Sequence, residues 1–424
     1  MSTPLPLAGG VGGGPVVGSP LPPPGPLPRA GGGDLALYVH WPFCVSKCPY
    51  CDFNSHVRSS VDQDAWREAL LADLAHEARL LPGRTLGSIF FGGGTPSLME
   101  PATVAALIEG ACAHWRPAAD IEITLEANPN SVEAGRFADL AAAGINRLSL
   151  GLQSFDEQAL AFLGRAHSAR EGFAALAIAQ KHFRRVSFDL IYALPGDTED
   201  SWSVTLAQAL ALGTSHLSAY QLTIEPGTRF AALHAAGKLK PLEEDSAAAL
   251  YELTDAMTSA AGLPAYEISN HARPGRESRH NLTYWRYGDY AGVGPGAHGR
   301  RLGMRTVRHR KPENFLSAQR RNGHGIAEEA RLLSREAADE ALVMGLRLTE
   351  GVDVGAVAAR FGFESIVDWA KVERLVASGH LKRDSSRIAL TPAGRLLLDH
   401  ILAEVSAGTP ISASEAATPV SAAA

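Results

Sequence analysis

Three cysteines near the start of the chain carry the strongest chemical signal in the sequence. Cys44, Cys48 and Cys51 follow the pattern C-x3-C-x2-C in the segment FCVSKCPYCDF. Thiolates are ligands for soft metals, and three of them this close together can surround one metal centre. The fourth cysteine, Cys112, belongs to an apolar helical run, and we interpret it as a buried core residue. The sequence therefore predicts a metal centre held by three cysteines.

A motif of three cysteines fits two kinds of metal centre. A structural zinc ion takes four protein ligands, usually as two separated pairs, so His40 or His56 would have to complete a zinc site. An iron–sulfur cubane held by three cysteines keeps one iron open for an exogenous ligand. We favour the iron–sulfur cluster because this spacing is uncommon in zinc sites, and the zinc site remains the alternative.

Short β-rich runs alternate with amphipathic helical runs over the first half of the chain. Helical periodicity is clear, for example, over residues 64–81. The β-rich runs predict six strands, at residues 35–41, 87–91, 121–127, 146–152, 186–192 and 215–224. Such alternation is typical of parallel strands joined by crossover helices. It predicts an α/β fold of six strands, either as an open sheet or curled into a partial (β/α)6 barrel.

Polar and glycine residues recur where the predicted strands end. They are Cys44, the segment 92–95, Glu126, Gln153, Asp189 and Gln221. In a (β/α) barrel the carboxyl ends of all strands face one rim, where active sites are built. Turn chemistry explains the glycines, but it does not explain Glu126 or Gln153 within apolar runs. We therefore expect one shared site.

Charge and hydropathy exclude several classes of protein. The 424 residues include 39 Lys+Arg and 45 Asp+Glu, a formal net charge of −6, so binding nucleic acid is not expected to be the main task. No apolar run approaches the roughly 18 residues that a membrane span requires. The N-terminus lacks the basic-then-apolar order of a signal peptide, which favours the cytoplasm. The most basic stretch, RRLGMRTVRHRKP at residues 300–312, is interpreted as a solvated loop.

Composition divides the chain into five regions. The two ends are rich in Pro and Gly or in Ala, Ser and Thr, and they predict disordered tails because they offer too little apolar surface for a core. The last helical runs are followed by a hairpin and a final helix, which predicts a small winged-helix-like α+β domain. The predicted regions are a tail (1–34), the barrel (35–242), an extension (243–330), the winged-helix-like domain (331–405) and a second tail (406–424).

With its motifs in this order, the sequence resembles the radical SAM superfamily. GGGTP follows the second strand, and LEANP, LGLQSF, LGRAHS and FDLIYALPG come later in the chain. The resemblance implies a [4Fe-4S] cluster on Cys44, Cys48 and Cys51, with S-adenosylmethionine (SAM) chelating the open iron. It also implies SAM contacts from Tyr38, Tyr50, Gly93, Gly94, Thr95, Glu126, Gln153, Arg165 and Asp189.

The segment HNLTYW, from His280 to Trp285, resembles the HNxxYW motif of the HemW branch, the haem chaperones of this superfamily. The resemblance implies haem binding, delivery of haem to respiratory membrane proteins and no coproporphyrinogen oxidase activity. Membrane contact is expected to be peripheral at most. A neutral imidazole is a common axial ligand of haem iron, so His280 is the candidate ligand. Without the resemblance, the segment is interpreted as core packing.

Two other functions stay open. The first is oxygen-independent coproporphyrinogen III dehydrogenase, whose motif usually continues as CxxxCxxCxC, where this chain has Phe53. The second is a zinc-binding regulator that uses the C-terminal domain on nucleic acid, although the predicted helix at residues 363–378 presents no basic face. A further hypothesis is that the cluster and SAM regulate homodimer formation or haem transfer rather than perform turnover.

Overall fold

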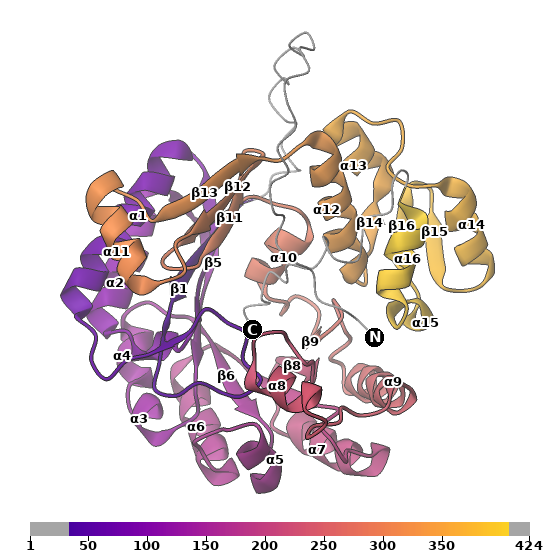
Figure 1. Cartoon of the computed structure of the whole chain (residues 1–424), viewed down its shortest axis with the longest axis horizontal. Helices are drawn as coiled ribbons and strands as arrows, with labels where there is room; N and C mark the ends of the chain where they lie inside the picture. Colours follow the sequence, from indigo (N-terminus) through magenta and orange to yellow (C-terminus); the bar gives the residue numbers. More distant parts are fainter. Residues whose placement is uncertain (1–33, 407–424) are drawn as a thin grey trace. The chain divides into compact units, whose positions relative to one another are not determined.

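The computed structural model describes residues 34–406. The predicted tails lie outside these residues, except for one residue of each. The described chain forms two compact units (Figure 1). We call residues 34–284 and 288–331 the barrel unit, and residues 285–287 and 332–406 the C-terminal unit. No helix within residues 34–406 is long and apolar enough to cross a membrane.

Six parallel strands form the centre of the barrel unit. They are β1 (Leu35–Trp41), β4 (Thr85–Gly93), β5 (Arg116–Ala127), β6 (Arg147–Gln153), β7 (Arg185–Tyr192) and β8 (His216–Gln221). Neighbours in the sheet follow chain order, and all five pairs are parallel. Each new strand is therefore added on the same side of the previous one, as in a (β/α) barrel. The prediction of a partial six-stranded barrel is confirmed.

Helices separate the parallel strands and cover their outer side (Figure 1). They begin at residues whose side chains cap the backbone; α6, for example, has Ser168 and Glu171 in a reciprocal capping box. The helices of this region are α1 (Gln63–Leu80), the 3-10 turn η1 (Pro96–Leu98), α2 (Pro101–His114), α3 (Ser131–Ala134), α4 (Phe137–Ala142), α5 (Glu157–Phe162), α6 (Ala169–His182), α7 (Glu199–Ala211), α8 (Arg229–Ala235) and α9 (Glu244–Ala260). A short parallel pair, β2 (Phe43–Cys44) and β3 (His56–Val57), frames the cysteine loop.

The segment after α9 extends the same sheet at both edges. Strand β9 runs antiparallel beside β8, and β10 runs parallel beside β1. The full order is β13-β12-β11-β10-β1-β4-β5-β6-β7-β8-β9, so within the described residues the sheet stays open. The added elements are β9 (Asn270–Ala272), α10 (Arg279–Trp285), β10 (Tyr290–Val293), β11 (His298–Arg301), β12 (Met304–Arg308), α11 (Pro312–Asn322) and β13 (Ile326–Arg331).

The interpretation of residues 300–312 as a solvated loop is wrong, because most of the stretch lies on strands and Arg300, Arg301 and Arg308 are buried. Arg301 and Arg308 lie on β11 and β12, and both side chains are buried. Arg301 Nε donates to Glu77 at 2.5 Å, and Arg308 donates to Glu77 at 2.6 Å and to Asp73 at 3.2 Å. Asp73 and Glu77 are four residues apart on α1 and thus share one face. Strand pairing places the side chains of Arg301 and Arg308 against this acidic face of α1.

The C-terminal unit consists of helices around a three-stranded antiparallel sheet, ordered β14-β16-β15. Three helices and a β-hairpin in this order have the elements of a winged helix, as predicted. The elements are α12 (Ser334–Arg347), β14 (Val352–Asp353), α13 (Val354–Phe361), α14 (Trp369–Ala377), β15 (Leu381–Asp384), β16 (Arg387–Leu390), α15 (Pro392–Arg395) and α16 (Leu398–Val405). The short segment from Trp285, the last residue of α10, to Tyr287 belongs to this unit.

Candidate functional site

The three cysteines lie together in one loop of the barrel unit. Cys44 is the last residue of β2, and the loop carries Cys48 and Cys51 before β3 begins. All three side chains are free thiols and partly buried. Burial raises the pKa of Cys51 to about 11, and the charges of Cys44 and Cys48 add to the increase. The three sulfurs are therefore close enough to interact electrostatically.

The two histidines that could complete a zinc site are engaged elsewhere. His40 Nε2 donates to the Asn54 carbonyl at 3.0 Å, and its Nδ1 accepts from the Tyr38 hydroxyl at 2.9 Å. His56 Nε2 donates to the Arg310 carbonyl at 3.3 Å. In the part of the chain that the structure describes, no group of three or more His, Cys, Asp or Glu side chains is placed to hold a single metal ion. The donor set fits a cubane cluster better, because each cysteine then binds a different iron.

The glycine-rich segment after β4 packs directly against the cysteine loop. Gly94 N donates to the Trp41 carbonyl at 2.7 Å, and the Thr95 hydroxyl donates to Cys44 Sγ at 3.5 Å. A Cβ atom on Gly94 would lie 3.0 Å from this sulfur and 2.8 Å from the Phe43 carbonyl oxygen. Gly93 has a φ of +116°, a conformation that L side chains rarely adopt. Glycine at these two positions allows the backbone to approach the cluster loop.

Arg165, in the connection between α5 and α6, joins three parts of the rim. Its guanidinium donates to Asn128 Oδ1 at 2.6 Å, to the Gly151 carbonyl at 2.8 Å and to Cys48 Sγ at 3.5 Å. Gly151 lies on β6, two residues before Gln153, whose φ of 67° is unusual for a residue other than glycine. Arg165 is thus held by the backbone of one strand end and by a cysteine of the loop.

Two acidic side chains on neighbouring regions of the rim have raised pKa values. Burial raises the pKa of Glu126 to about 8, and the charge of Asp189 adds to the increase. Burial also raises the pKa of Asp189 to about 6. Glu126 Oε2 accepts a hydrogen bond from Gly93 N at 3.1 Å. Burial disfavours the ionised forms of these two carboxyl groups. A positively charged ligand would stabilise the ionised forms, so the pair suits such a ligand.

Several buried polar atoms at the rim have no hydrogen-bond partner among residues 34–406. They are Oε1 of Glu126, Oε1 of Gln153 and Nε of Arg165. Buried polar atoms are rarely left unpaired, so such a group points to a missing ligand. SAM offers an ammonium group, a carboxylate, ribose hydroxyls and a sulfonium, which match acceptors, a guanidinium and carboxylates. These residues fit the cofactor.

Both tyrosines among the predicted SAM contacts lie close to these groups. The Tyr38 ring is on β1 beside Phe90 of β4, its partner in the strand register. Tyr50 lies between two cysteines of the loop, and its ring is 6.4 Å from that of Phe230. All the predicted SAM contacts are in the barrel unit, on strands β1, β4, β5, β6 and β7 or in the loops beside them. Their individual roles as SAM contacts stay predictions.

Sequence reasoning did not assign two residues that organise the rim. His40 was considered only as a metal ligand, yet its ring lies beneath Gly93, whose Cβ would be 2.6 Å from it. Burial lowers the pKa of His40 to about 4, so the ring is neutral. Asn128 orients Arg165 and follows Glu126 by two residues, within the LEANP motif. Its position in that motif is the signal that could have identified it.

His280, on α10 of the barrel unit, lies beside Tyr38, with ring centroids 6.1 Å apart. Its ring is 3% exposed and stacks on Phe90, with ring centroids 4.9 Å apart. Its Nδ1 is 3.4 Å from Ser88 Oγ. Burial lowers the pKa of His280 to about 3, so the imidazole is neutral. Glu122 on β5 accepts from the backbone N–H groups of Arg279 and His280 and so caps the start of α10.

A cluster loop of three cysteines after the first strand of a partial barrel, with a rim suited to SAM, is typical of radical SAM proteins. Residues 38–209 match the radical SAM superfamily, and residues 332–397 match the HemN C-terminal domain. The chain is 38% identical to the heme chaperone HemW of Escherichia coli (strain K12) over 378 residues, which cover 87% of this chain and 97% of that protein.

Other relatives extend this similarity. A Mus musculus protein named radical S-adenosyl methionine domain-containing protein 1, mitochondrial, is 40% identical over 394 residues, which cover 89% of this chain and 88% of that one. Among solved structures, coproporphyrinogen III oxidase (HemN) from Escherichia coli, a radical SAM enzyme, has a TM-score of 0.73 at 24% identity and covers 87% of this chain and 89% of its own. That likeness concerns the fold.

The chain belongs to the HemW family of the radical SAM superfamily. Membership in the superfamily implies a [4Fe-4S] cluster and SAM, and the donor set at the rim fits both. When bound, the cluster supplies the electron with which radical SAM proteins cleave SAM. Cys44, Cys48 and Cys51 are the residues that would hold the cluster, and Thr95 and Arg165 donate hydrogen bonds to two of their sulfurs.

Proposed function

We propose that this chain is a haem chaperone, which binds haem and passes it to respiratory membrane proteins without oxidising coproporphyrinogen. The similarity to the heme chaperone HemW of Escherichia coli, over 97% of that protein, carries the proposal. The HNLTYW segment supports it, as does Phe53 at the position where the dehydrogenase motif continues with cysteine. The chain is expected to act in the cytoplasm, which cell fractionation tests.

In this proposal the cluster and SAM regulate the protein rather than convert a substrate. The rim presents a site that suits SAM, whereas Phe53 replaces the further cysteine of the dehydrogenase motif. Occupation of the rim then controls homodimer formation or the transfer of haem. Size-exclusion chromatography of the protein with and without cluster and SAM tests this role, and an identical elution volume in both states argues against control of assembly.

His280 is the proposed axial ligand of the haem iron. The neutral imidazole is the form that ligates iron, and the lowered pKa of His280 keeps the ring neutral at physiological pH. The ring is enclosed by Phe90, Tyr38 and Tyr284, which lie within 6.1 Å between ring centroids. A haem therefore reaches this nitrogen only after α10 is displaced from the ring cluster.

A haem titration of the full chain tests the proposal. The wild-type protein should develop a Soret band at one equivalent of haem, and His280→Ala should shift or weaken it. His182→Ala, on the exposed surface of α6, is the matched control and should bind as the wild type does. A wild-type protein that binds no haem contradicts the chaperone function. An unchanged band in a folded His280→Ala protein removes this residue as the ligand.

The second candidate function is oxygen-independent coproporphyrinogen III dehydrogenase. The fold of HemN over 87% of this chain is the observation in its favour. Under anaerobic, reducing conditions with SAM and a reconstituted cluster, the chaperone proposal predicts no protoporphyrinogen from coproporphyrinogen. Formation of protoporphyrinogen with turnover would replace the proposal by the dehydrogenase.

A further inference from the structure

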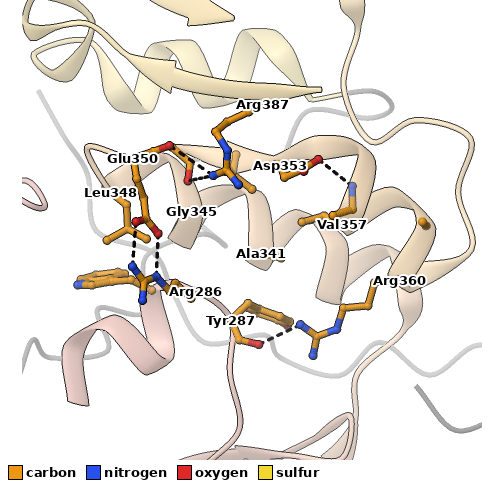
Figure 2. Close-up of a pocket in the computed structure, with 15 residues that line it drawn as sticks. Arg286, Tyr287, Ala341, Gly345, Leu348, Glu350, Asp353, Val357, Arg360 and Arg387 are labelled. Carbon is orange, nitrogen blue, oxygen red and sulfur yellow. Dashed lines mark hydrogen bonds and ion pairs between the residues drawn. The ribbon is translucent and has the colours of Figure 1, made fainter. Parts of the chain in front are cut away.

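The C-terminal unit contains a pocket of about 560 Å³. This volume lies within the range of ligand sites, roughly 300–1,000 Å³. Residues of α12, β14, α13 and β16 line it together with the segment Trp285–Tyr287 (Figure 2). All of these residues belong to one compact unit. The pocket is therefore separate from the cysteine loop and the rim, which belong to the barrel unit.

The inner surface of the pocket is apolar and its sides are aromatic. Ala341, Gly345, Leu348 and Val357 line it from α12, the loop after α12, and α13. Gly345 is required at its position, because a Cβ there would lie 2.6 Å from Val352. The absence of a side chain at Gly345 lets Val352 of β14 pack closely against α12.

Trp285 and Tyr287 supply the aromatic rings. The guanidinium carbon of Arg347 lies 4.7 Å from the centre of the Trp285 ring, and that of Arg360 lies 5.5 Å from the centre of the Tyr287 ring. Such arginine–aromatic pairs hold the rings in place and keep positive charge beside them. Trp285 and Tyr287 are only 5% and 4% exposed, so the rings form part of the pocket wall and are not open stacking faces.

Three arginines line the pocket, whereas its two carboxylates are already engaged. Arg286 donates to Glu350 through Nε at 2.7 Å and through a terminal nitrogen at 2.8 Å. Asp353 accepts from Ser386 Oγ at 2.7 Å and caps α13. Arg387 is exposed, and it donates to the backbone carbonyls of Glu350 and Gly351 at 3.4 Å each, which are long hydrogen bonds. A guanidinium has five donors, so Arg387 can also bind an anionic group.

We propose that this pocket holds the porphyrin body of haem, with a propionate on Arg387. The inference rests on the proposed haem chaperone function and adds the place where the ligand is held. An apolar interior, aromatic sides and arginines match a flat, apolar ring system that carries carboxylates.

The test titrates the full chain with iron-free protoporphyrin IX and follows porphyrin fluorescence. Without iron there is no axial ligation, so binding reports on the pocket alone. Ala356→Trp fills the pocket from an exposed position on α13, and Arg387→Glu reverses the charge at the exposed start of β16. Each should weaken binding at least tenfold, since a hydrogen bond to a charged group is worth about that factor or more. Lys382→Glu, on β15, is the matched control and should stay within about twofold of wild type by comparison with surface charge effects.

The outcomes separate this inference from the function on which it rests. A wild-type chain that binds haem but not iron-free porphyrin overturns the pocket and leaves the chaperone proposal standing. A chain that binds neither overturns both. Equal affinity of wild type, Ala356→Trp and Arg387→Glu, with unchanged circular dichroism, also overturns the pocket. Protoporphyrin dimethyl ester should bind more weakly than the free acid, and equal affinity would contradict the contact with Arg387.

Discussion

The rim of the barrel unit and the pocket of the C-terminal unit are built for ligands of opposite charge. The rim places Glu126 and Asp189 in surroundings that disfavour their ionised forms, and it leaves polar atoms unpaired. The pocket places Arg286 and Arg387 beside apolar and aromatic surface. The rim fits the cation SAM, and the pocket fits an anionic porphyrin. If the pocket holds the porphyrin as proposed, substitutions should separate cofactor binding from haem binding.

The largest effect is expected at the cysteine loop. Cys48→Ser removes one of three thiolates and should abolish the cluster, because a hydroxyl is a poor ligand for iron in a cubane. Iron and sulfide content after anaerobic reconstitution should fall close to zero. Cys112→Ser, on α2, is the matched control and should retain wild-type content. Equal content in the two variants would show that the cluster is not held by this loop.

The next largest effect concerns Arg165. Replacement by alanine removes the hydrogen bonds to Asn128 and Gly151. It also removes Nε, a buried donor with no partner among residues 34–406, and the loss of one charged hydrogen bond to SAM, worth about 1.5–3 kcal/mol, should lower SAM affinity at least tenfold. Isothermal titration of the reconstituted protein measures it, and Arg170→Ala, exposed on α6, should bind SAM normally. Normal binding by both variants would contradict a role of Arg165 at the SAM site.

A pH effect of intermediate size is expected from the two buried carboxyl groups. Glu126 has a pKa of about 8 in the folded protein, above its ordinary value of 4.5. Between these values the folded chain holds a proton that the unfolded chain has lost, so the free energy of unfolding falls as pH rises through this range. Asp189 has a pKa of about 6 against an ordinary value of 3.8, so it adds to this decrease in the free energy of unfolding in the lower part of the pH range.

Urea denaturation of the cofactor-free protein from about pH 5 to about pH 8 measures this dependence. Glu126→Gln should make the decrease in the free energy of unfolding smaller. Glu68→Gln, exposed on α1, is the control and should preserve the wild-type slope. A slope unaffected by Glu126→Gln would place the proton-binding group elsewhere.

The smallest effect is expected at the edge of the pocket. Arg286 and Glu350 form an ion pair whose side chains are 54% and 46% exposed. Exposed pairs contribute about 1 kcal/mol or less, so Glu350→Gln should change the free energy of unfolding by no more than that. Urea denaturation at high and low salt measures the change. A loss of several kcal/mol in the free energy of unfolding would mean that this ion pair is essential to the stability of the C-terminal unit.

The sequence predicts the barrel unit well because its signals are local. Alternating strands and helices define the parallel sheet, and strand ends in a barrel meet at one rim. The same logic fails for Arg301 and Arg308, since nothing in the basic stretch indicates the acidic face of α1 against which it packs. Local signals indicate which strands form. The ion-pair partners of charged residues on those strands depend on the tertiary fold.

The pocket of the C-terminal unit could not be predicted from the sequence. It brings together Trp285 and Arg387, which are about one hundred residues apart and belong to no shared motif. Glycine is needed at position 345 only because Val352 packs against it after folding. The burial of His280 agrees with the interpretation of its segment as core packing, whereas its role as a haem ligand comes only from the resemblance.

One measurement tests most directly whether haem binding depends on the cluster. The full chain with Cys44, Cys48 and Cys51 all replaced by serine is titrated with haem beside the wild type, under anaerobic conditions. The account predicts that the triple variant binds no cluster and yet retains the wild-type affinity for haem. Loss of haem binding together with the cluster, in a chain that remains folded, would contradict it.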